Sequence, residues 1–216
     1  MDILIQEARR KSVVANSVAL IKTNSDLDGL GLNDIEQKFV KKERKGKNQI
    51  IEVNRFKNRT FIVYGDTKGA QNIKLESYRK AGNNTLLLLN NAKISRVVVN
   101  SINSTKEETL AFIEGLVLGN YQFLKYKTGD NKKKNSLSKI EIYSKDITTK
   151  DIEEFQIVID AVCYARDYVN EPDSFMTAVQ LSKEAQALGQ SSGAKVEVFN
   201  KKKIETLKMG GLLAVN

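Results

Sequence analysis

The segment VVVNSINSTKEETLAFIEGLVLGNYQF, residues 97–123, predicts a strand followed by a helix. Val97–Asn100 is a short apolar run of the kind found in strands that are covered on both faces. Ser104 and Glu107 have the spacing of a capping box, in which each side chain bonds a backbone amide at the start of a helix. Behind them, apolar residues recur at helical spacing at Leu110, Ile113, Leu116, Val117 and Leu124. We therefore expect a helix from this box to about Phe123.

The chain before this segment shows the same alternation of short strands and amphipathic helices. The strands predicted there are Ser12–Lys22, Gln49–Phe56, Arg59–Tyr64 and Leu86–Leu89, the middle two pairing as a hairpin across Lys57-Asn58. The helices predicted there are Asn33–Lys42 and Ile73–Ala81, the second ending at Gly82-Asn83-Asn84. Residues 23–31 are expected to form a loop, and the charged residues 41–47 a turn between strands.

The chain after the segment continues in the same manner. A lysine-rich loop, residues 125–139, is predicted to precede a strand at Ile140–Tyr143. A second capping box, Thr148 and Asp151, is expected to start a helix that Pro172 ends. The elements predicted beyond it are a helix at Thr177–Leu188, a strand at Lys195–Phe199, a helix at Lys201–Lys208 and a strand at Leu212–Val215. Strands that alternate with helices predict an α/β fold with a parallel or mixed sheet.

The scarcity of histidine and cysteine limits the chemistry that the chain can perform. The sequence has no histidine and one cysteine. These counts exclude serine–histidine and cysteine–histidine catalysis, imidazole zinc sites and a disulfide within the chain. Cys163 falls on the apolar face of a predicted helix, which is typical of a buried structural thiol.

The remaining candidates for a functional site have structural explanations. Glu107-Glu108 and Glu153-Glu154 are predicted in the first turn of a helix, where free backbone amides favour negative charge. The glycines in predicted polar loops, which belong to no phosphate-binding motif, are Gly29, Gly31 and Gly46. We therefore assign no catalytic, cofactor-binding or metal-binding residue in this sequence.

Positive charge is concentrated in the first part of the chain. The net charge is +9, yet residues 151–216 contain more acidic than basic side chains. Lysine clusters at 41–47 and 132–134 could neutralise the phosphates of a nucleic acid. Few aromatic side chains lie beside them for bases to stack on, so a solvated surface is the competing explanation.

No feature of the sequence indicates a membrane partner. No apolar run approaches the roughly 18 residues that span a bilayer. Asp2 and Glu7 do not fit the basic start of a secretory signal. We expect a cytoplasmic protein.

Three segments in the second half of the chain resemble the leucyl aminopeptidase family. EGLVLGNYQFLKYK at 114–127 is similar to a family helix that ends in E-G-x-x-L-G-x-Y-x-F-x-x-Y-K. ARDYVNEP at 165–172 matches the family's linker motif A-R-D-x-x-N-E-P. Residues 195–198, KVEV, with residues 209–215, MGGLLAV, resemble the first strand, helix and glycine turn of the catalytic domain. Before residue 114 only the order of elements matches.

This resemblance implies a domain organisation. Residues 1–150 would form a macro-domain-like α/β domain, residues 151–172 a linker helix, and residues 173–216 the truncated beginning of the carboxy-terminal peptidase domain. The parent enzyme would be a hexamer that uses two divalent cations, zinc or manganese, to remove amino-terminal residues from peptides. The family's metal-binding and catalytic motifs, V-G-K-G-x-x-F-D-S-G-G and N-T-D-A-E-G-R-L, do not occur in residues 1–216. The chain alone is therefore expected to be an inactive fragment that serves assembly or active-site access.

A second interpretation stays open at this point. The basic α/β domain would be a self-sufficient module that binds nucleic acid or, by analogy with macro domains, an ADP-ribose-like ligand. A third is a folded domain whose role is subunit contact.

Overall fold

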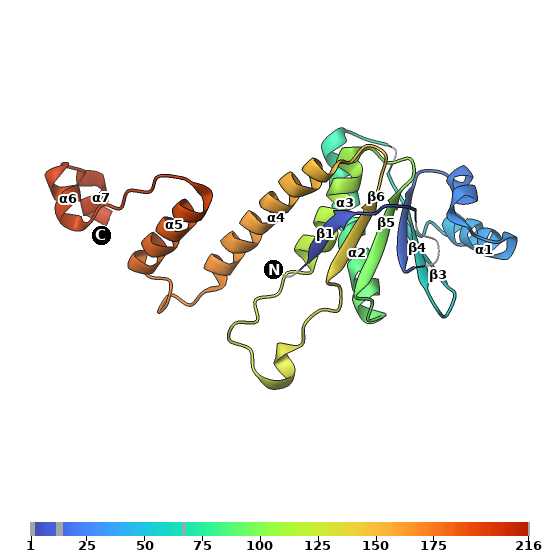
Figure 1. Ribbon diagram of the computed structural model, residues 1–216, viewed down its shortest axis with the longest axis horizontal. Coiled ribbons are helices and arrows are strands. Elements are labelled where there is room, and N and C mark those ends of the chain that lie inside the picture. The colour runs from blue at the N-terminus through green and yellow to red at the C-terminus, as the bar shows by residue number, and fades with distance from the viewer. Residues whose placement is uncertain (1–2, 12–14, 67, 216) are drawn as a thin grey trace. The chain divides into compact units, whose positions relative to one another are not determined.

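The computed structural model describes residues 3–11, 15–66 and 68–215, and it divides into two compact units (Figure 1). The first unit is Met1–Ala165 and the second is Arg166–Asn216. Residues 12–14 of the strand predicted at Ser12–Lys22 lie outside the described residues. The domain limits expected at residues 150 and 172 stay predictions.

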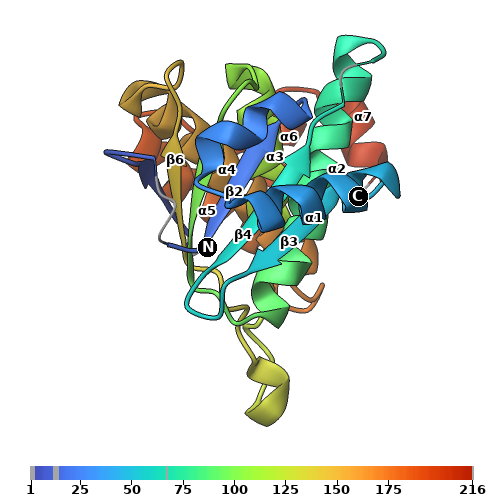
Figure 2. The same ribbon diagram turned by 90° about the vertical axis from the view of Figure 1, so that its right-hand side faces the viewer.

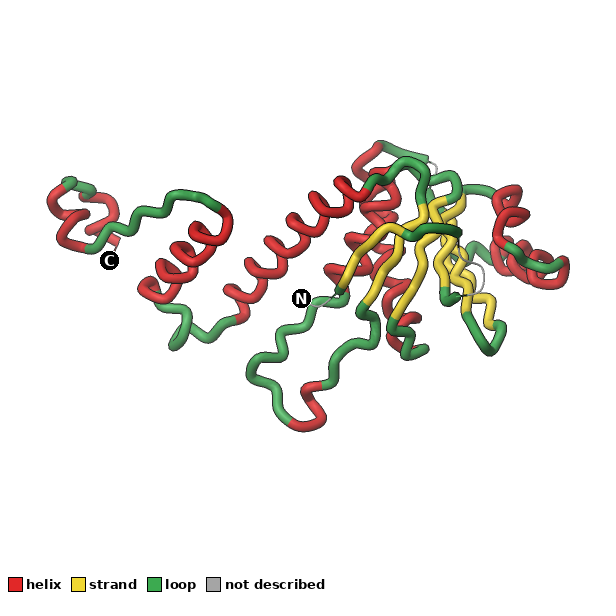
Figure 3. The backbone as a smooth tube through the Cα atoms, viewed as in Figure 1, coloured by secondary structure: helices red, strands yellow, loops and turns green. Residues whose placement is uncertain are grey.

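The first unit is built on a six-stranded mixed sheet (Figures 2 and 3). Its strands are β1 (Leu4–Glu7), β2 (Ser17–Ile21), β3 (Ile50–Asn54), β4 (Arg59–Tyr64), β5 (Arg96–Ser101) and β6 (Lys139–Tyr143). Their spatial order is β1-β6-β5-β2-β4-β3, and all neighbours are parallel except β3 and β4. The predicted hairpin and the predicted mixed α/β sheet flanked by helices are therefore confirmed.

Helices and short 3-10 turns connect these strands. The first unit contains η1 (Asn24–Leu30), α1 (Asp34–Lys45), α2 (Gln71–Asn91), α3 (Lys106–Gly119) and η2 (Gly129–Lys132). Helix α4 (Thr149–Asn170) begins in the first unit and ends in the second. The second unit contains α5 (Ala178–Ser192), α6 (Lys201–Thr206) and α7 (Gly210–Val215).

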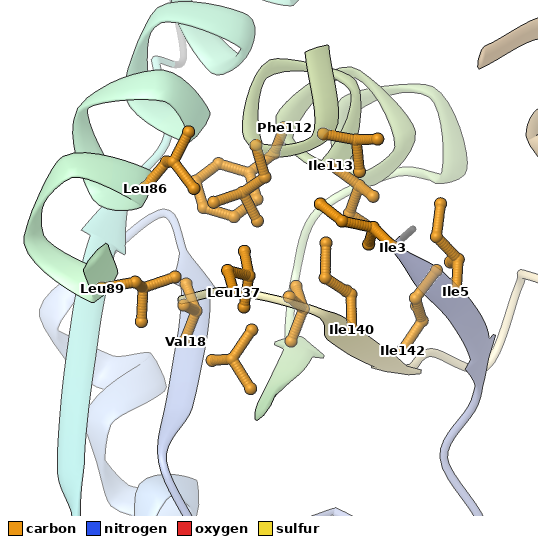
Figure 4. Close-up of a cluster of buried hydrophobic side chains, with 14 of the residues drawn as sticks. Ile3, Ile5, Val18, Leu86, Leu89, Phe112, Ile113, Leu137, Ile140 and Ile142 are labelled. Carbon is orange, nitrogen blue, oxygen red and sulfur yellow. The ribbon is translucent and has the colours of Figure 1, made fainter. Parts of the chain in front are cut away.

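Two apolar cores cover the two faces of the sheet, because successive side chains of a strand point to opposite faces. Val18 and Leu20 of β2 belong to the larger core, which α2, α3 and α4 share. Ala19 and Ile21 of the same strand belong to the smaller core beneath η1 and α1. Figure 4 shows the larger core, where Phe112 of α3 lies among the aliphatic side chains of α2 and the strands.

Helix α2 is longer than predicted and includes residues that were predicted as a helix stop and a strand. The stop at Gly82 and the strand at Leu86–Leu89 are both wrong, because one helix runs through them. Leu86 and Leu89 are buried while Leu87 is exposed, which is a helical pattern rather than an alternating one.

The glycine in the middle of α2 is required by the neighbouring helix. A Cβ atom at Gly82 would lie 2.1 Å from the carbonyl oxygen of Phe112 in α3. A Cβ atom at Gly115 of α3 would lie 2.0 Å from the carbonyl oxygen of Arg79 in α2. The two helices therefore cross with their backbones in contact, which only glycine permits at these positions.

The ends of several helices differ from the prediction. The capping box of α3 is Thr105 and Glu108, one residue later than expected, and α3 ends at Gly119 rather than near Phe123. The predicted loop at residues 23–31 contains η1, and the predicted turn at 41–47 is mostly the last turns of α1. The predicted start of α4 is confirmed, since the Asp151 amide donates to the Thr148 hydroxyl at 3.3 Å.

In its described residues, the second unit has no strand at either of the two places where one was predicted. The structure has no strand at Lys195–Phe199, and Leu212–Val215 lies in α7. An isolated strand is not stable without a neighbour to pair with, and the described residues 166–215 contain no paired strand. The predicted helices at Thr177–Leu188 and Lys201–Lys208 are confirmed as α5 and α6, with Thr177 and Asn200 as their N-caps.

Candidate functional site

Four parallel strands, β6, β5, β2 and β4, lie side by side and end at the same edge of the sheet, named here the carboxyl edge. This edge is at the top of Figure 1, where α2, α3 and α4 begin. In open α/β sheets, ligand sites form outside the carboxyl ends of the strands, because the loops there diverge to opposite faces. The residues that follow each strand are therefore the first candidates for a site.

A partly buried ion pair connects β2 to α3 at this edge. The Lys22 ammonium lies 2.9 Å from Oε2 of Glu108, whose side chain is only 6% exposed. The same carboxylate oxygen accepts a hydrogen bond of 2.8 Å from the Thr105 backbone amide, as the capping box requires. Glu108 therefore holds the start of α3 and compensates the charge of Lys22.

Asp26 of η1 organises the loop that follows β2. Its Oδ2 accepts hydrogen bonds of 2.9 Å from the backbone amides of Lys22 and Thr23, and its Oδ1 accepts one from the Asn103 side chain. Burial by itself would raise the pKa of Asp26, but these hydrogen bonds outweigh it and hold the pKa below its ordinary value. A carboxylate so occupied is a structural anchor rather than a base.

Tyr78 of α2 fills the space beneath the end of β4. Its hydroxyl lies 3.5 Å from Oγ of Ser104, and a Cβ atom at Gly65 would lie 1.8 Å from that hydroxyl. Burial raises the pKa of Tyr78 to about 12. The phenol is therefore neutral at physiological pH.

Two cavities open at the carboxyl edge. The β5/β6 cavity, about 330 Å³, is lined by Lys11, Ser101, Ile102, Asn103, Ser104, Tyr143, Ser144, Lys145 and Asp146. The β2/β4 cavity, about 440 Å³, is lined by Lys22, Arg44, Gln49, Tyr64, Gly65, Asp66, Lys68 and Ser77. Both volumes fall in the range of roughly 300–1,000 Å³ that is typical of small-ligand sites.

Of the two glutamate pairs predicted in the first turn of a helix, one lies there and the other does not. Glu107 and Glu108 lie in the first turn of α3, as predicted, and hydrogen bonds from its own backbone amide and from Thr105 lower the pKa of Glu107. The prediction for Glu153 and Glu154 is wrong, because α4 begins at Thr149 and both lie beyond its first turn.

The cysteine, the loop glycines and the second lysine cluster considered as candidates lie at positions with a structural role or on the surface. Cys163 is 3% exposed in the larger core, which confirms a buried thiol. Gly31 has φ = 61° at the end of η1, and Gly46 caps α1, so both are turn glycines. Lysines of the 132–134 cluster are exposed at the end of η2.

Within the described residues, no three His, Cys, Asp or Glu side chains are close enough together to hold a metal ion. None of the helices formed by these residues is both long and apolar enough to cross a bilayer. The side chains that meet at the β2/β4 cavity were not found by sequence reasoning. Lys22 and Tyr64 stand at the ends of predicted strands and could have been proposed from that position. Arg44 belongs to the basic cluster at 41–47, whereas Lys68 has no comparable signal in the sequence.

Two domain models of one family match the chain, in order. The model of the cytosol aminopeptidase family's N-terminal domain matches residues 62–130, and the model of its catalytic domain matches residues 163–216. Together they cover more than half of the 216 residues. The chain belongs to the cytosol aminopeptidase family. The resemblance seen in the sequence motifs at 114–127 and 165–172 is thereby confirmed.

Curated relatives of this family member are similar over part of their length. A probable cytosol aminopeptidase of Clostridium perfringens is 38% identical over 117 residues, which are 50% of this chain and 23% of that protein. One of Aquifex aeolicus is 32% identical over 143 residues, 65% of this chain and 29% of that protein. One of Chloroherpeton thalassium is 28% identical over 191 residues, 77% of this chain and 36% of that protein. The chain thus spans about a quarter to a third of the length of these relatives.

Solved structures share the fold at low sequence identity. A variant of tomato leucine aminopeptidase superposes with a TM-score of 0.73 at 16% identity, covering 95% of this chain and 46% of that one. A cytosol aminopeptidase from Coxiella burnetii superposes with a TM-score of 0.63 at 14% identity, covering 94% and 41%. The arrangement of helices and strands is therefore that of leucine aminopeptidases.

Proposed function

We propose that this chain supplies the amino-terminal domain and the opening of the catalytic domain of a cytoplasmic, metal-dependent aminopeptidase. The supporting observation is the match of both domain models of one family, in order, on one chain. Residues 1–150 would be the accessory domain, residues 151–172 the linker helix, and residues 173–216 the first part of the peptidase domain. The reaction would remove amino-terminal residues from peptides.

The metal chemistry of this enzyme is proposed to lie outside residues 1–216. The described side chains do not fit a pair of divalent cations, since no cluster of three ligating groups is among them. The family motifs expected to carry zinc or manganese do not occur in the sequence. No step of peptide hydrolysis is therefore assigned to a side chain of this chain.

The accessory role of the first unit is proposed from its packing. Its sheet has a core on each face, so it can fold without the peptidase domain. In the second unit, by contrast, Gly189 is the one buried residue among those described, and Leu181, Leu188 and Leu212 are about half exposed. Apolar surface of this kind is suited to burial by further parts of a peptidase domain. The first unit would then contribute to a hexameric assembly or to access to the active site.

An assay of residues 1–216 tests where the chemistry lies. The purified chain is incubated with Leu-p-nitroanilide and Mn²⁺ or Zn²⁺, and release of p-nitroaniline is followed by absorbance. We expect no metal-dependent turnover, because the ligands and the base are missing. Turnover that requires the metal and disappears with a chelator would show that residues 1–216 contain a catalytic centre.

A further inference from the structure

The β2/β4 cavity has an unusual balance of charge. Three of its lining side chains are basic, Lys22, Arg44 and Lys68, and one is acidic, Asp66. They come from segments far apart in the sequence: the end of β2, the last turn of α1, and the loop between β4 and α2. The fold therefore gathers positive charge at the carboxyl ends of two parallel strands.

Within residues 3–11, 15–66 and 68–215, one of the three basic groups has an anionic partner of its own. Lys22 is paired with Glu108 at 2.9 Å. Arg44 donates to the backbone oxygen of Asn48 at 3.2 Å, and its guanidinium carbon lies 4.5 Å from the centre of the Tyr64 ring. Neither of these partners is charged, so Arg44 retains its positive charge and several of its five N–H donors.

Lys68 is the second uncompensated group. Within the described part of the chain, its ammonium forms no ion pair with a carboxylate. The Asp66 side chain accepts a hydrogen bond from the backbone amide of Lys68 at 3.1 Å. Among the described residues that line this cavity, Asp66 is thus the one carboxylate, and Arg44 and Lys68 form no ion pair with a described carboxylate.

We propose that the β2/β4 cavity binds a small phosphorylated molecule. The planar guanidinium of Arg44 can bond two phosphate oxygens at once, and stacking on Tyr64 fixes its position. Lys68 adds a second charge, and the Ser77 hydroxyl and Gln49 amide are neutral donors on the same lining. Asp66 would accept a hydrogen bond from a hydroxyl of the ligand. The site goes beyond peptide hydrolysis and does not depend on it.

The size and position of the cavity favour a small molecule over a nucleic acid. Its volume of about 440 Å³ is that of a small-ligand pocket. The other basic residues of the 41–47 cluster are not part of the lining, so no continuous basic groove is formed by the cavity residues. Crevices at the carboxyl ends of parallel strands are where α/β sheets bind phosphorylated ligands.

Isothermal titration of residues 1–216 with inorganic pyrophosphate tests the site. We expect saturable binding to one site that weakens with added salt. Lys68→Gln and Arg44→Gln should each weaken it about tenfold or more, since each removes a charge-assisted contact. Lys68 is exposed and forms no ion pair with a described residue, so we expect its replacement to leave the fold intact.

Matched controls are available at the opposite edge of the sheet. Lys57→Gln removes an exposed lysine from the β3–β4 turn, and Arg59→Gln removes an arginine from the start of β4. Both should bind pyrophosphate like the unmodified chain. Absence of binding, or equal weakening by the control variants, would overturn the proposal. A single-stranded oligonucleotide that displaces pyrophosphate from the unmodified chain, and binds more weakly to Lys68→Gln, would assign the cavity to nucleic acid. That result would also overturn the proposal.

Discussion

Gly82→Ala tests the close crossing of α2 and α3, on which the first unit depends. In an exposed helix, alanine would stabilise this position by about 1 kcal/mol relative to glycine. At Gly82 the new methyl group would lie 2.1 Å from the carbonyl oxygen of Phe112 and 3.0 Å from the amide nitrogen of Leu116. Both are backbone atoms of a buried helix, so neither can rotate away.

The two helices must therefore separate by about 1 Å to restore ordinary contact distances. Overpacking of a core costs about 1–3 kcal/mol, and a clash with backbone belongs at the upper end of that range. After the gain in helix propensity is subtracted, we expect a net loss of about 2 kcal/mol in the free energy of unfolding.

Urea unfolding followed by far-UV circular dichroism measures this loss. Asn84→Ala is the matched control, because Asn84 is exposed in the same helix and alanine there should be slightly stabilising, by about 0.5 kcal/mol. Gly115→Ala should resemble Gly82→Ala, and the double variant should lose less than the sum, since both methyl groups separate the same helices. A Gly82→Ala chain as stable as the unmodified one would show that α2 and α3 do not cross with their backbones in contact at this position.

Three further predictions concern single side chains. Hydrogen bonds from the Lys106 ammonium and from the backbone amide and hydroxyl of Thr148 lower the pKa of Asp151 to about 2. An NMR titration of the Asp151 carboxyl should therefore have its midpoint near pH 2, and the midpoint should move to higher pH in Lys106→Met. Because the pKa of Asp151 in the folded chain is below the unfolded value of about 3.9, the ionised carboxylate stabilises the fold above about pH 3.9. This contribution is lost as the pH falls toward 2. Burial raises the pKa of Tyr78 to about 12, so the stability that its neutral phenol contributes should be lost as the pH rises from about 10 to 12. Phenolate absorbance should show a tyrosine that titrates near pH 12 and that Tyr78→Phe removes. The Asn90 side-chain oxygen accepts from the backbone amides of residues 136 and 137 at 3.0 and 3.2 Å, so Asn90→Ala should lower the urea midpoint by the equivalent of about 1–3 kcal/mol.

Local signals were sufficient for elements that are stabilised locally. The start of α1, the capping residues of α4, the β3–β4 hairpin and the apolar strand β5 could all be predicted, because their decisive contacts are within a few residues. The α3 capping box was misplaced by one position since Ser104 and Thr105 are both suitable N-caps. Ser104 instead lies beside the Tyr78 hydroxyl, a contact that spans 26 residues of sequence.

Elements that depend on distant contacts could not be predicted. Gly82 has the sequence character of a helix stop, and only the approach of α3 explains its place inside α2. Strand β1 was not predicted, because its partner β6 lies far along the chain, with Leu4 opposite Lys139. The strands expected at 195–199 and 212–215 have the right composition but no paired neighbour among the described residues.

The candidate site could not be predicted either, because its residues come from segments that are far apart in the sequence. Arg44 belongs to the basic cluster at 41–47, but nothing in the sequence connects it with Lys22 and Lys68. The fold brings the three together near the carboxyl ends of β2 and β4. The sequence motifs that identify the family lie in α3, α4 and beyond, and none of them lines the β2/β4 cavity. Family membership and the proposed phosphate site therefore rest on separate parts of the chain.

We propose that residues 1–216 function as the amino-terminal part of a metal-dependent aminopeptidase. The most direct test of this claim is a chimera in which these residues replace the matching part of the Clostridium perfringens relative, with hydrolysis of Leu-p-nitroanilide measured with and without Mn²⁺ or Zn²⁺. We predict metal-dependent hydrolysis by the chimera and none by residues 1–216 alone. A folded chimera that binds the metal but does not hydrolyse the substrate, while the unmodified relative does, would contradict the claim.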